Sequence, residues 1–392
     1  MLERYATDIL GTLDLVAKTV GASSVIIAVK RSYKRTIDAV APLIGTFSNM
    51  TLCRLPEVYP AGDEVVLIYE ATGRVVAPGA LPISVGVTVF NVETVYNMSR
   101  LLSGGALTHK FVTVAGEVAH PTTLRVPLGT PISLLIEQAG GVTTDAPAYV
   151  FGGPMMGRLG SPVEPVTKTT NAVLVLPESH VIVQKKRAKP FLDMKRAMAA
   201  CCQCSYCTEL CPRHLLGHPI EPHRFMLVAS NGVTNDVTPY VNAAFCTGCG
   251  LCEMYSCCQG LSPRMLLAAC KSGLRQQGVR PPANAELAPV SEARSYRRVP
   301  MSRLMARLGL TPYNKSAPLS DERVRPSQLH LLLSQHIGAP SVPTVRVGDT
   351  VTAGQCIAAA AEGALSVGLH APLDGVVDSV TDRVITIRVK EG

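Results

Sequence analysis

The sequence predicts a multidomain α/β protein, and three observations support this fold class. Helical and strand-like patterns alternate over residues 1–105, two groups of closely spaced cysteines lie within residues 190–275, and short alternating strands fill residues 327–392. With 392 residues, 47% of them hydrophobic, the chain is long enough for several compact domains. We expect two further parts between these, a small mixed domain at 106–180 and a linker at 276–326.

The N-terminal part is expected to contain a parallel sheet covered by helices. Its helices are expected at 5–20, 32–45 and 92–102, and its strands at 23–30, 49–55 and 84–90. Alternation of this kind is typical of Rossmann-like folds, which bind ligands at the carboxyl ends of their strands. The loops at 59–64 and 90–94 lie there, although their residue types alone favour a turn followed by a helix cap.

The next part combines short strands with one helix, which indicates a β-grasp fold. Strands are expected at 110–118 and 122–129, and glycines end a short helix at 131–141. A further strand enters the glycine-rich turn GGPMMG at 152–157. This turn lacks the lysine and hydroxyl of a phosphate-binding loop, so we expect its methionines to pack against a neighbouring domain.

The C-terminal part is expected to be a small β barrel or sandwich. Its strands alternate apolar and polar residues and are separated by Gly-Asp and Asp-Gly turns. The pattern is similar to the hammerhead of biotinyl and lipoyl carriers, but the turn PLDGVV at 372–377 contains no lysine to modify. Before it, the linker carries a short amphipathic helix at 301–310, which we expect to clamp onto an earlier domain.

Two cysteine runs dominate the chemistry of the chain. The first run comprises Cys201, Cys204, Cys207 and Cys211, and the second comprises Cys246, Cys249, Cys252 and Cys257. Three cysteines at steps of three can hold three corners of one [4Fe–4S] cluster, while the distal fourth cysteine ligates the other cluster. The spacing therefore predicts one cluster on Cys201, Cys204, Cys207 and Cys257, and a second on Cys246, Cys249, Cys252 and Cys211.

Other uses of these cysteines fit the spacing less well. Zinc sites pair two short knuckles, whereas each run here has three close cysteines and a distal one. Disulfides between cysteines so close in sequence are strained, and nothing in the sequence indicates export. Cys202 and Cys258 adjoin predicted ligands and are either spare thiols or alternative ligands, Cys258 in place of Cys257. Cys53, Cys270 and Cys356 are interpreted as small buried hydrophobic residues.

Composition narrows the class of protein. The net charge of +8 is partly concentrated at 183–198, where a solvated helix face is the favoured interpretation and a docking surface for an acidic redox partner the alternative. Few aromatic residues and no recognised motif argue against nucleic-acid binding. No apolar run reaches the ~20 residues of a membrane span, and the first ten residues do not resemble a signal peptide. Thirteen cysteines favour a reducing cytoplasm.

Several segments, taken in order, resemble one protein family. They are VYPAGDE (58–64), NVET (91–94), GGPMMG (152–157), PVTKTTNAVLVLP (165–177), CSYCTELCPRHLLGH (204–218), YRRVPMSRLMARLGL (296–310) and HIGAPSVPTVRVGDTVTAGQ (336–355). Together they resemble the cobalamin reductases of propanediol-utilisation microcompartments. These are similar to the C subunit of the Rnf electron-transport complex and, more distantly, to the NADH-binding subunit of complex I.

The resemblance implies a set of domains, cofactors and partners. It implies a complex-I-type flavin/NADH-binding domain at 1–105, an SLBB β-grasp domain at 106–180 and a ferredoxin-like domain with two [4Fe–4S] clusters at 190–275. NADH would donate electrons to FMN, and the clusters would pass them to cobalamin. A flavin is needed because NADH gives two electrons together and a cluster takes one. Implied partners are a corrinoid adenosyltransferase and shell proteins, in the cytoplasm within a bacterial microcompartment.

The resemblance also implies flavin contacts. Members of the family open with a glycine-rich segment that holds the flavin phosphate, and the present sequence starts at the helix that follows it, so the expected domain is truncated. The remaining contacts match Tyr59, Gly62 and Glu64 in one loop, and Asn91 and Thr94 in the other, with Phe90 replacing a family asparagine.

Alternative functions remain open at this stage. The chain is alternatively a non-catalytic ferredoxin-like carrier or scaffold, or a peripheral subunit of an Rnf-type membrane complex. His214 and His218 are candidate cobalt ligands, but a polar residue in the turn after Cys211 is the favoured interpretation of both.

Overall fold

The computed structural model describes residues 1–281 and 285–390. The chain forms two compact units, each assembled from two separate stretches of sequence. Unit 1 comprises Met1–Ser99 and Arg187–Thr311, and unit 2 comprises Arg100–Lys186 and Pro312–Gly392. The N-terminal α/β part therefore shares a unit with the cysteine runs. The finer domain bounds stay a prediction.

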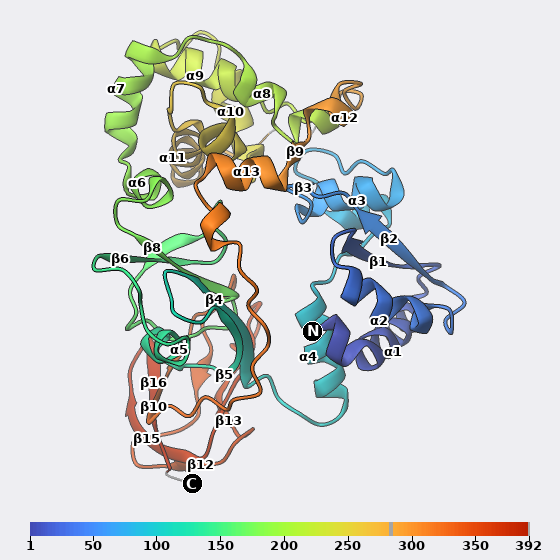
Figure 1. Cartoon of the computed structure of the whole chain (residues 1–392), viewed down its shortest axis with the longest axis vertical. Helices are drawn as coiled ribbons and strands as arrows, with labels where there is room; N and C mark the ends of the chain where they lie inside the picture. The colour runs from blue at the N-terminus through green and yellow to red at the C-terminus, as the bar shows by residue number, and fades with distance from the viewer. Residues whose placement is uncertain (282–284, 391–392) are drawn as a thin grey trace. The chain divides into compact units, whose positions relative to one another are not determined.

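Unit 1 begins with two helices packed on two parallel strands (Figure 1). These elements are α1 (Leu2–Val20), β1 (Val25–Lys30), α2 (Lys34–Ile44) and β2 (Met50–Leu55). Strands β1 and β2 pair in parallel with Val25 opposite Met50, so the predicted parallel sheet is confirmed for these strands. Gly21 ends α1 with a left-handed φ of 67°, where the sequence predicted the end.

The strand expected at 84–90 is wrong. The structure has a 3₁₀ turn there, η1 (Pro82–Val85), and no strand is assigned among the described residues 81–91. Gly86 adopts a left-handed φ of 69° and interrupts the apolar run. The valines of this run pack against the preceding helix α3 (Glu64–Thr72) instead of joining a sheet. Helix α4 (Val92–Leu102) then follows as predicted.

A segment far along the chain returns to the N-terminal part of unit 1. Strand β9 (Val299–Pro300) pairs antiparallel with β3 (Val58–Tyr59), and α13 (Met301–Arg307) follows directly. The Met301 amide donates to the Glu57 carbonyl at 3.0 Å. The predicted clamp helix is therefore confirmed, and it sits beside the loop of the expected flavin contacts. Two short elements flank it, α12 (Arg294–Arg297) and η5 (Thr311–Tyr313).

Short helices surround the cysteine runs. Three of them, α7, α9 and α11, begin with proline at the first position, where the missing N–H costs no hydrogen bond. Their inner faces form one apolar cluster around Ala197, Phe225 and Leu266. The elements of this region are α7 (Pro190–Ala200), α8 (Tyr206–Glu209), η2 (His214–Leu216), α9 (Pro222–Ser230), α10 (Thr238–Asn242), η3 (Ala243–Phe245), η4 (Cys252–Ser256) and α11 (Pro263–Gln276). Helix α6 (Val181–Arg187) precedes them and lies almost entirely in the stretch that belongs to unit 2.

Gly217 joins the turn after the first cysteine run to the linker. The φ angle of Gly217 is +87°, and a Cβ atom at this residue would lie 1.9 Å from the Ala288 carbonyl oxygen. The amide of Ala288 donates a hydrogen bond to the Gly217 carbonyl oxygen at 3.0 Å. Gly217→Ala is therefore expected to lower the free energy of unfolding by about 2–4 kcal/mol in urea titrations. Gly232→Ala is the matched control, because Gly232 is also left-handed but has no atom within 4 Å. Equal losses in both variants would contradict the clash.

Unit 2 starts with a five-stranded mixed sheet and one helix, α5 (Ile132–Gln138). Strands β4 and β8 pair in parallel, and the remaining neighbours pair antiparallel. In the order β5-β4-β8-β6-β7, the strands are Thr122–Pro127, His109–Gly116, Ala172–Pro177, Pro147–Phe151 and Arg158–Gly160. The strands and helix predicted for this part are confirmed.

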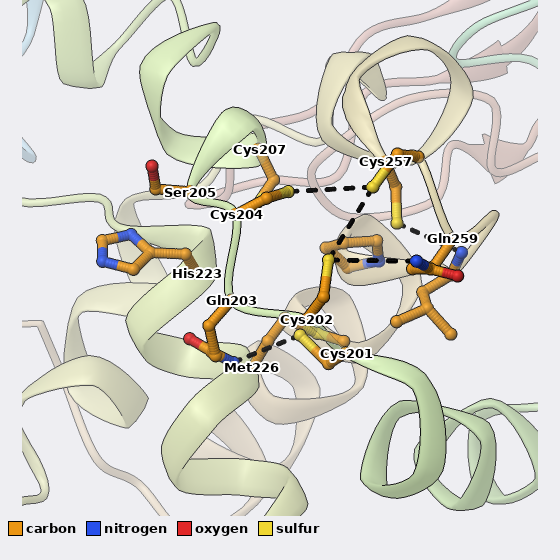
Figure 2. A pocket seen from close by; sticks show the side chains of 13 residues that line it. Cys201, Cys202, Gln203, Cys204, Ser205, Cys207, His223, Met226, Cys257 and Gln259 are labelled. Carbon is orange, nitrogen blue, oxygen red and sulfur yellow. Dashed lines mark hydrogen bonds between the residues drawn. The ribbon is translucent and has the colours of Figure 1, made fainter.

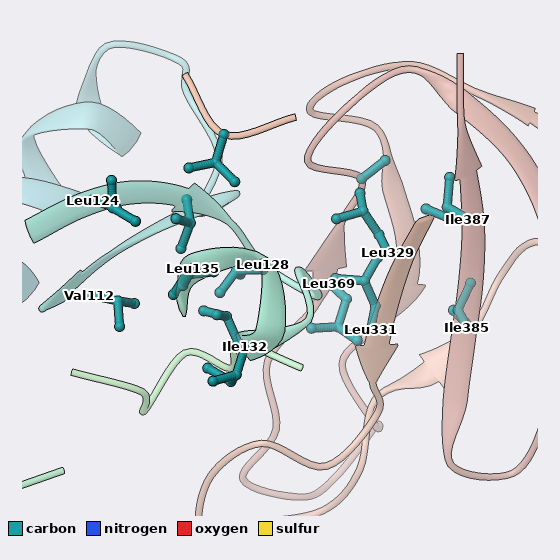
Figure 3. Close-up of a cluster of buried hydrophobic side chains, with 14 of the residues drawn as sticks. Val112, Leu124, Leu128, Ile132, Leu135, Leu329, Leu331, Leu369, Ile385 and Ile387 are labelled. Carbon is teal, nitrogen blue, oxygen red and sulfur yellow. The ribbon is translucent and has the colours of Figure 1, made fainter. Parts of the chain in front are cut away.

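The C-terminal part of unit 2 forms two small antiparallel sheets, as predicted for a barrel or sandwich. One has the order β10-β16-β15-β12 and the other β11-β13-β14. Their bounds are β10 (Gln328–Leu332), β11 (Val342–Pro343), β12 (Thr350–Val351), β13 (Cys356–Ala359), β14 (Leu369–His370), β15 (Gly375–Val380) and β16 (Val384–Val389). Side chains such as Leu329, Leu369 and Ile387 belong to the same buried cluster as Val112 and Leu135 (Figure 3).

His109 makes unit 2 sensitive to acid. Burial, with Arg125 and Arg100 nearby, lowers its pKa to about 4. Between pH 6.5 and 4 the unfolded chain therefore binds more protons, and stability falls as the pH falls. We expect a loss of about 2 kcal/mol between pH 7 and pH 5 in urea titrations, absent in His109→Gln. NMR of labelled histidine should place the midpoint near 4, and a midpoint near 6.5 would contradict the burial argument.

Candidate metal centres

The cysteine runs form two pockets within unit 1. The Cys201 pocket is lined by Cys201, Cys204, Cys207 and Cys257 (Figure 2). The exposed Cys202 and Cys258 also line it, at its rim. The Cys246 pocket is lined by Cys211, Cys246, Cys249 and Cys252. The distal cysteine of each run thus lies with the three close cysteines of the other run.

The two cysteine loops share one backbone pattern. Two and four residues after the first cysteine, each loop has a residue in the left-handed conformation. These are Gln203 (φ 54°) and Ser205 (φ 60°) in the first loop, and Gly248 (φ 71°) and Gly250 (φ 86°) in the second. Left-handed residues turn the chain tightly, so cysteines at steps of three reach the same pocket. In the first loop, side chains other than glycine bear the strain of this conformation.

N–H groups point at three of the pocket sulfurs. The Leu261 amide donates to Cys257 Sγ at 3.3 Å, and the Gly248 amide donates to Cys246 Sγ at 3.4 Å. In the Cys201 pocket, Gln203 Nε2 donates to Cys201 Sγ at 3.2 Å (Figure 2). Such donors favour the thiolate over the thiol, and hydrogen bonds to sulfur are one of the factors that set cluster potentials.

The electrostatics of both pockets favour a bound cation. Burial raises the pKa of Cys207, Cys211 and Cys249 to about 12, and neighbouring cysteines add to the effect. Thiolates are therefore unstable here unless a positive ion lies among them, and a coordinated metal deprotonates a thiol outright. Among the described residues that line the two pockets, none is aspartate or glutamate. An all-sulfur donor set suits iron–sulfur clusters or zinc, and excludes magnesium or calcium.

A buried ion pair joins the Cys246 pocket to the expected flavin loop. Arg213, two residues after Cys211, lines the pocket and donates through Nε and an Nη atom to both carboxylate oxygens of Asp63, at 2.9 and 3.1 Å. The two side chains are only 14% and 9% exposed. A second pair involves Arg264, which also lines this pocket, and the fully buried Glu253, at 3.6 Å. Sequence reasoning missed both pairs.

Tyr59 makes a direct contact with the second cysteine loop. Its hydroxyl donates to the Cys249 carbonyl oxygen at 2.7 Å, and burial raises the pKa of the phenol, so it stays protonated as a donor. Together with the Asp63–Arg213 pair, this bond fixes the loop 59–64 against the Cys246 pocket. The loop 59–64 therefore carries expected flavin contacts and also contacts the backbone of the cysteine loop that lines the Cys246 pocket.

The other expected flavin contacts lie at the starts of two helices. Glu64 is the first residue of α3, where the Asp63 side chain accepts a hydrogen bond from the Val66 amide at 3.2 Å. Asn91 precedes α4 and its side chain accepts from the Glu93 amide at 2.9 Å, while Thr94 lies in the first turn. The helix-cap interpretation of both loops is thus confirmed. It is compatible with anion binding, because free backbone N–H groups gather at a helix start.

His218 is not available to ligate cobalt. It is only 2% exposed, and its Nε2 lies 3.0 Å from the Val76 carbonyl oxygen. Burial lowers its pKa to about 4, which keeps the imidazole neutral. His214 lies in the 3₁₀ turn η2 that follows Cys211. The interpretation of both as polar residues of this turn is therefore favoured by the structure.

The remaining cysteines differ in exposure. Cys53 and Cys270 are partly buried, but Cys356 is exposed, so its interpretation as a buried hydrophobic residue is wrong. Cys356 opens strand β13, in which Ile357 and Ala358 turn inward and the end residues face outward. Cys202 and Cys258, also exposed, lie at the rim of the Cys201 pocket.

Four stretches of the chain match known domain families. Residues 1–100 match the Nuo51 FMN-binding domain, 111–159 the SLBB domain, 200–262 the 4Fe-4S dicluster domain, and 312–390 the RnfC barrel sandwich hybrid domain. The match over 200–262 contains all eight cysteines of the two runs. These matches support flavin and iron–sulfur clusters as the cofactors, and favour iron over zinc.

Relatives that align with almost the whole chain show which family it belongs to. The chain is 44% identical to the cobalamin reductase PduS of Salmonella typhimurium over 371 residues, which cover 94% of this chain and 81% of that protein. It belongs to the cobalamin reductase family. The Citrobacter freundii member is 42% identical with the same coverage. The C subunit of the Na⁺-translocating ferredoxin:NAD⁺ oxidoreductase complex of Acetobacterium woodii is 31% identical, over 55% of this chain and 46% of that protein.

Membership of this family identifies the chain as an iron–sulfur oxidoreductase. Within the described residues, every helix is too short or too polar to cross a lipid bilayer.

Proposed function

We propose that this chain carries electrons from NADH through FMN and two [4Fe–4S] clusters to a corrinoid. The observation that carries the proposal is the pairing of cysteines in the two pockets, where each set of four combines both runs. Four sulfurs around each of two neighbouring cavities are the donor set that two cubane clusters require. The 44% identity to a cobalamin reductase supports a corrinoid as the acceptor.

The proposed ligands follow from the pocket linings. Cys201, Cys204, Cys207 and Cys257 would hold one cluster, and Cys246, Cys249, Cys252 and Cys211 the other. When bound, the clusters would accept and release single electrons, and the flavin would divide the electron pair of NADH between such steps. We assign Cys257 as the ligand in preference to Cys258, because Cys257 is partly buried and receives the Leu261 N–H bond, whereas Cys258 is exposed.

The chain's own groups hold the thiolates and exclude water. Backbone N–H donors stabilise negative charge on the sulfurs, and burial keeps water away from Cys211 and Cys252. Arg213 and Arg264, each paired with a carboxylate, line the Cys246 pocket, whereas none of the described residues that line the Cys201 pocket is arginine or lysine. Nearby charges set a cluster's potential, so the two centres would differ in potential.

The flavin would be held by Tyr59, Gly62, Glu64, Asn91 and Thr94. Support comes from the FMN-binding match over residues 1–100 and from the contact of Tyr59 with Cys249. This contact puts the flavin loop beside the Cys246 pocket, so the centre in that pocket is the one nearer to the flavin. The exposed Cys204 and its neighbours put the Cys201 pocket at the surface, where an acceptor can approach.

The proposed context follows the family resemblance. The reduced corrinoid would pass to a corrinoid adenosyltransferase, and shell proteins of a bacterial microcompartment would enclose the enzyme. These partners and this compartment rest on the family resemblance alone.

Anaerobic purification and three measurements test the proposal. We expect about eight irons and eight acid-labile sulfides per chain, two reduced signals in low-temperature electron paramagnetic resonance, and NADH-dependent reduction of hydroxocobalamin by flavin-reconstituted protein. Full clusters without NADH oxidation would identify a ferredoxin-like carrier or scaffold instead. Sedimentation of the native protein with membranes would favour an Rnf-type subunit. Zinc in place of iron would overturn the proposal.

A further inference from the structure

Two thiols that the proposed clusters do not use meet at the rim of the Cys201 pocket. Cys202 and Cys258 are 56 positions apart in the sequence, and their Sγ atoms lie 3.9 Å apart. Each directly follows a proposed cluster ligand, Cys201 or Cys257. Both side chains are exposed. Of the thirteen cysteines, Cys202, Cys204 and Cys258 form a group whose sulfurs all lie within 4.8 Å of one another.

We propose that Cys202 and Cys258 form a reversible disulfide that protects the ligands of the Cys201 pocket. A disulfide needs the sulfurs at about 2.05 Å, so the two must approach by roughly 2 Å. Turning two exposed side chains toward each other supplies such a movement without shifting the helices on either side. The bond would connect the loop after Cys201 to the loop after Cys257, which are the first and last ligands of one cluster.

Cys204 is the competing partner, and the cluster decides between them. Its Sγ also lies 3.9 Å from Cys258 Sγ. With the cluster bound, Cys204 is coordinated to iron and unavailable for sulfur exchange, which leaves Cys202 as the partner of Cys258. Gln259 Nε2, 3.9 Å from Cys202 Sγ, holds this thiol at the rim (Figure 2).

The oxidant we name is hydrogen peroxide. One thiol attacks a peroxide oxygen, which breaks the O–O bond, gives a sulfenic acid and releases one water. The neighbouring thiol attacks that sulfur, forms the S–S bond and releases the second water. Two thiols and one peroxide thus give one disulfide and two waters, and the two electrons lost by sulfur reduce the peroxide. A thiol donor such as thioredoxin or dithiothreitol reverses the step by exchange.

The arrangement protects the ligand cysteines because the sulfenic acid formed first reacts at once with the neighbouring thiol. A sulfenic acid without a neighbour proceeds to the sulfinic acid, which is not reversed by thiols. Where the neighbour is 3.9 Å away, condensation precedes the second oxidation. The ligand cysteines behind the rim are then spared.

The test uses the holoprotein, treated without oxygen with equimolar hydrogen peroxide and then digested with trypsin. Trypsin places Cys202 on peptide 197–213 and Cys258 on peptide 225–264. We expect these peptides to be linked after oxidation and separated by dithiothreitol. Cys202→Ser and Cys258→Ser should each lower the yield of the linked pair more than about tenfold. Cys356→Ser, which removes an exposed cysteine elsewhere, should leave the yield unchanged.

Further measurements distinguish formation of the Cys202–Cys258 disulfide from damage to the clusters. Electron paramagnetic resonance of both single variants should show both clusters before oxidation, since neither residue is a proposed ligand. With a second equivalent of hydrogen peroxide, the remaining thiol of each variant should gain two oxygens, one from each peroxide, whereas the wild-type pair should only lose two hydrogens. Linked peptides that persist in Cys202→Ser, or wild-type thiols that stay free after peroxide, would overturn the proposal. So would zinc that binds the holoprotein at these thiols and blocks the link.

Discussion

Replacing Cys211 with alanine is expected to remove the iron–sulfur centre of the Cys246 pocket and leave that of the Cys201 pocket. Cys211 belongs to the first run in sequence but lies with Cys246, Cys249 and Cys252 in space. Alanine supplies no ligand, and the buried Cys246 pocket admits little water to replace the lost sulfur. The iron content should fall from about eight to about four per chain, with the loss of one of the two reduced paramagnetic signals.

The mirror variant gives the decisive control. Cys257→Ala should remove the other centre, because Cys257 belongs to the second run and lines the Cys201 pocket. Cys270→Ala removes a partly buried cysteine of the same region that lines neither pocket, and should leave both signals unchanged. If Cys211→Ala instead removes the signal that Cys204→Ala removes, each run holds its own cluster and the crossed assignment is wrong.

The crossed grouping could be predicted from the sequence because the spacing within each run is typical of two-cluster ferredoxins, although the cysteines that it brings together, such as Cys211 and Cys246, are distant in the chain. Steps of three bring cysteines to one side of a tight loop, and the distal cysteine lies one helical turn beyond. Local signals located the end of α1 at Gly21 and the strands β4, β5 and β6 of unit 2. Such features depend on residues close together in the chain, where patterns are most informative.

The errors have the opposite origin. Residues 84–90 have the β-branched composition of a strand, but their valines pack against α3 and the left-handed Gly86 breaks the run. Tertiary packing overrides propensity there. The apolar neighbours of Cys356 favour a buried position for it, but it lies at the exposed end of β13, and the pairing register shifts between Cys356 and the buried Ala358.

The pairs that sequence reasoning missed join distant parts of the chain. Asp63 and Arg213 are 150 positions apart, and Tyr59 and the Cys249 carbonyl 190. No periodicity or spacing reports such pairs. The one available signal was the presence of an acid in a loop already singled out, YPAGDE, and of a base beside a predicted ligand, CPR.

Removing the charge of Asp63 is expected to give the largest loss of stability in unit 1. Asp63→Asn leaves Arg213 buried at 14% exposure without its partner, and an unpaired buried charge costs about 3–5 kcal/mol. Asparagine is as good an N-cap as aspartate, so the start of α3 is preserved and the loss reports the ion pair. Urea titrations of the anaerobic protein measure the free energy of unfolding.

The double variant distinguishes the pair from either residue alone. Arg213→Met should be destabilising by a similar amount, because Asp63 then becomes the unpaired buried charge. In Asp63→Asn combined with Arg213→Met no charge is left buried, so more than half of the loss should return, with a coupling free energy above about 1 kcal/mol. Arg213→Lys should retain only part of the stability that the Asp63–Arg213 pair provides, because an ammonium group cannot reproduce the two parallel hydrogen bonds to the carboxylate.

The same variants connect stability to electron transfer. Arg213 is a positive charge in the lining of the Cys246 pocket, so Arg213→Met should lower the reduction potential of that centre and leave the other unchanged. Asp63→Asn removes a nearby negative charge and should therefore raise the reduction potential of the centre in the Cys246 pocket. Opposite shifts in a redox titration would show that the pair sets the potential of the centre nearest the flavin loop. Shifts of the same sign, or shifts in both centres, would mean that the variants act only by loosening the fold.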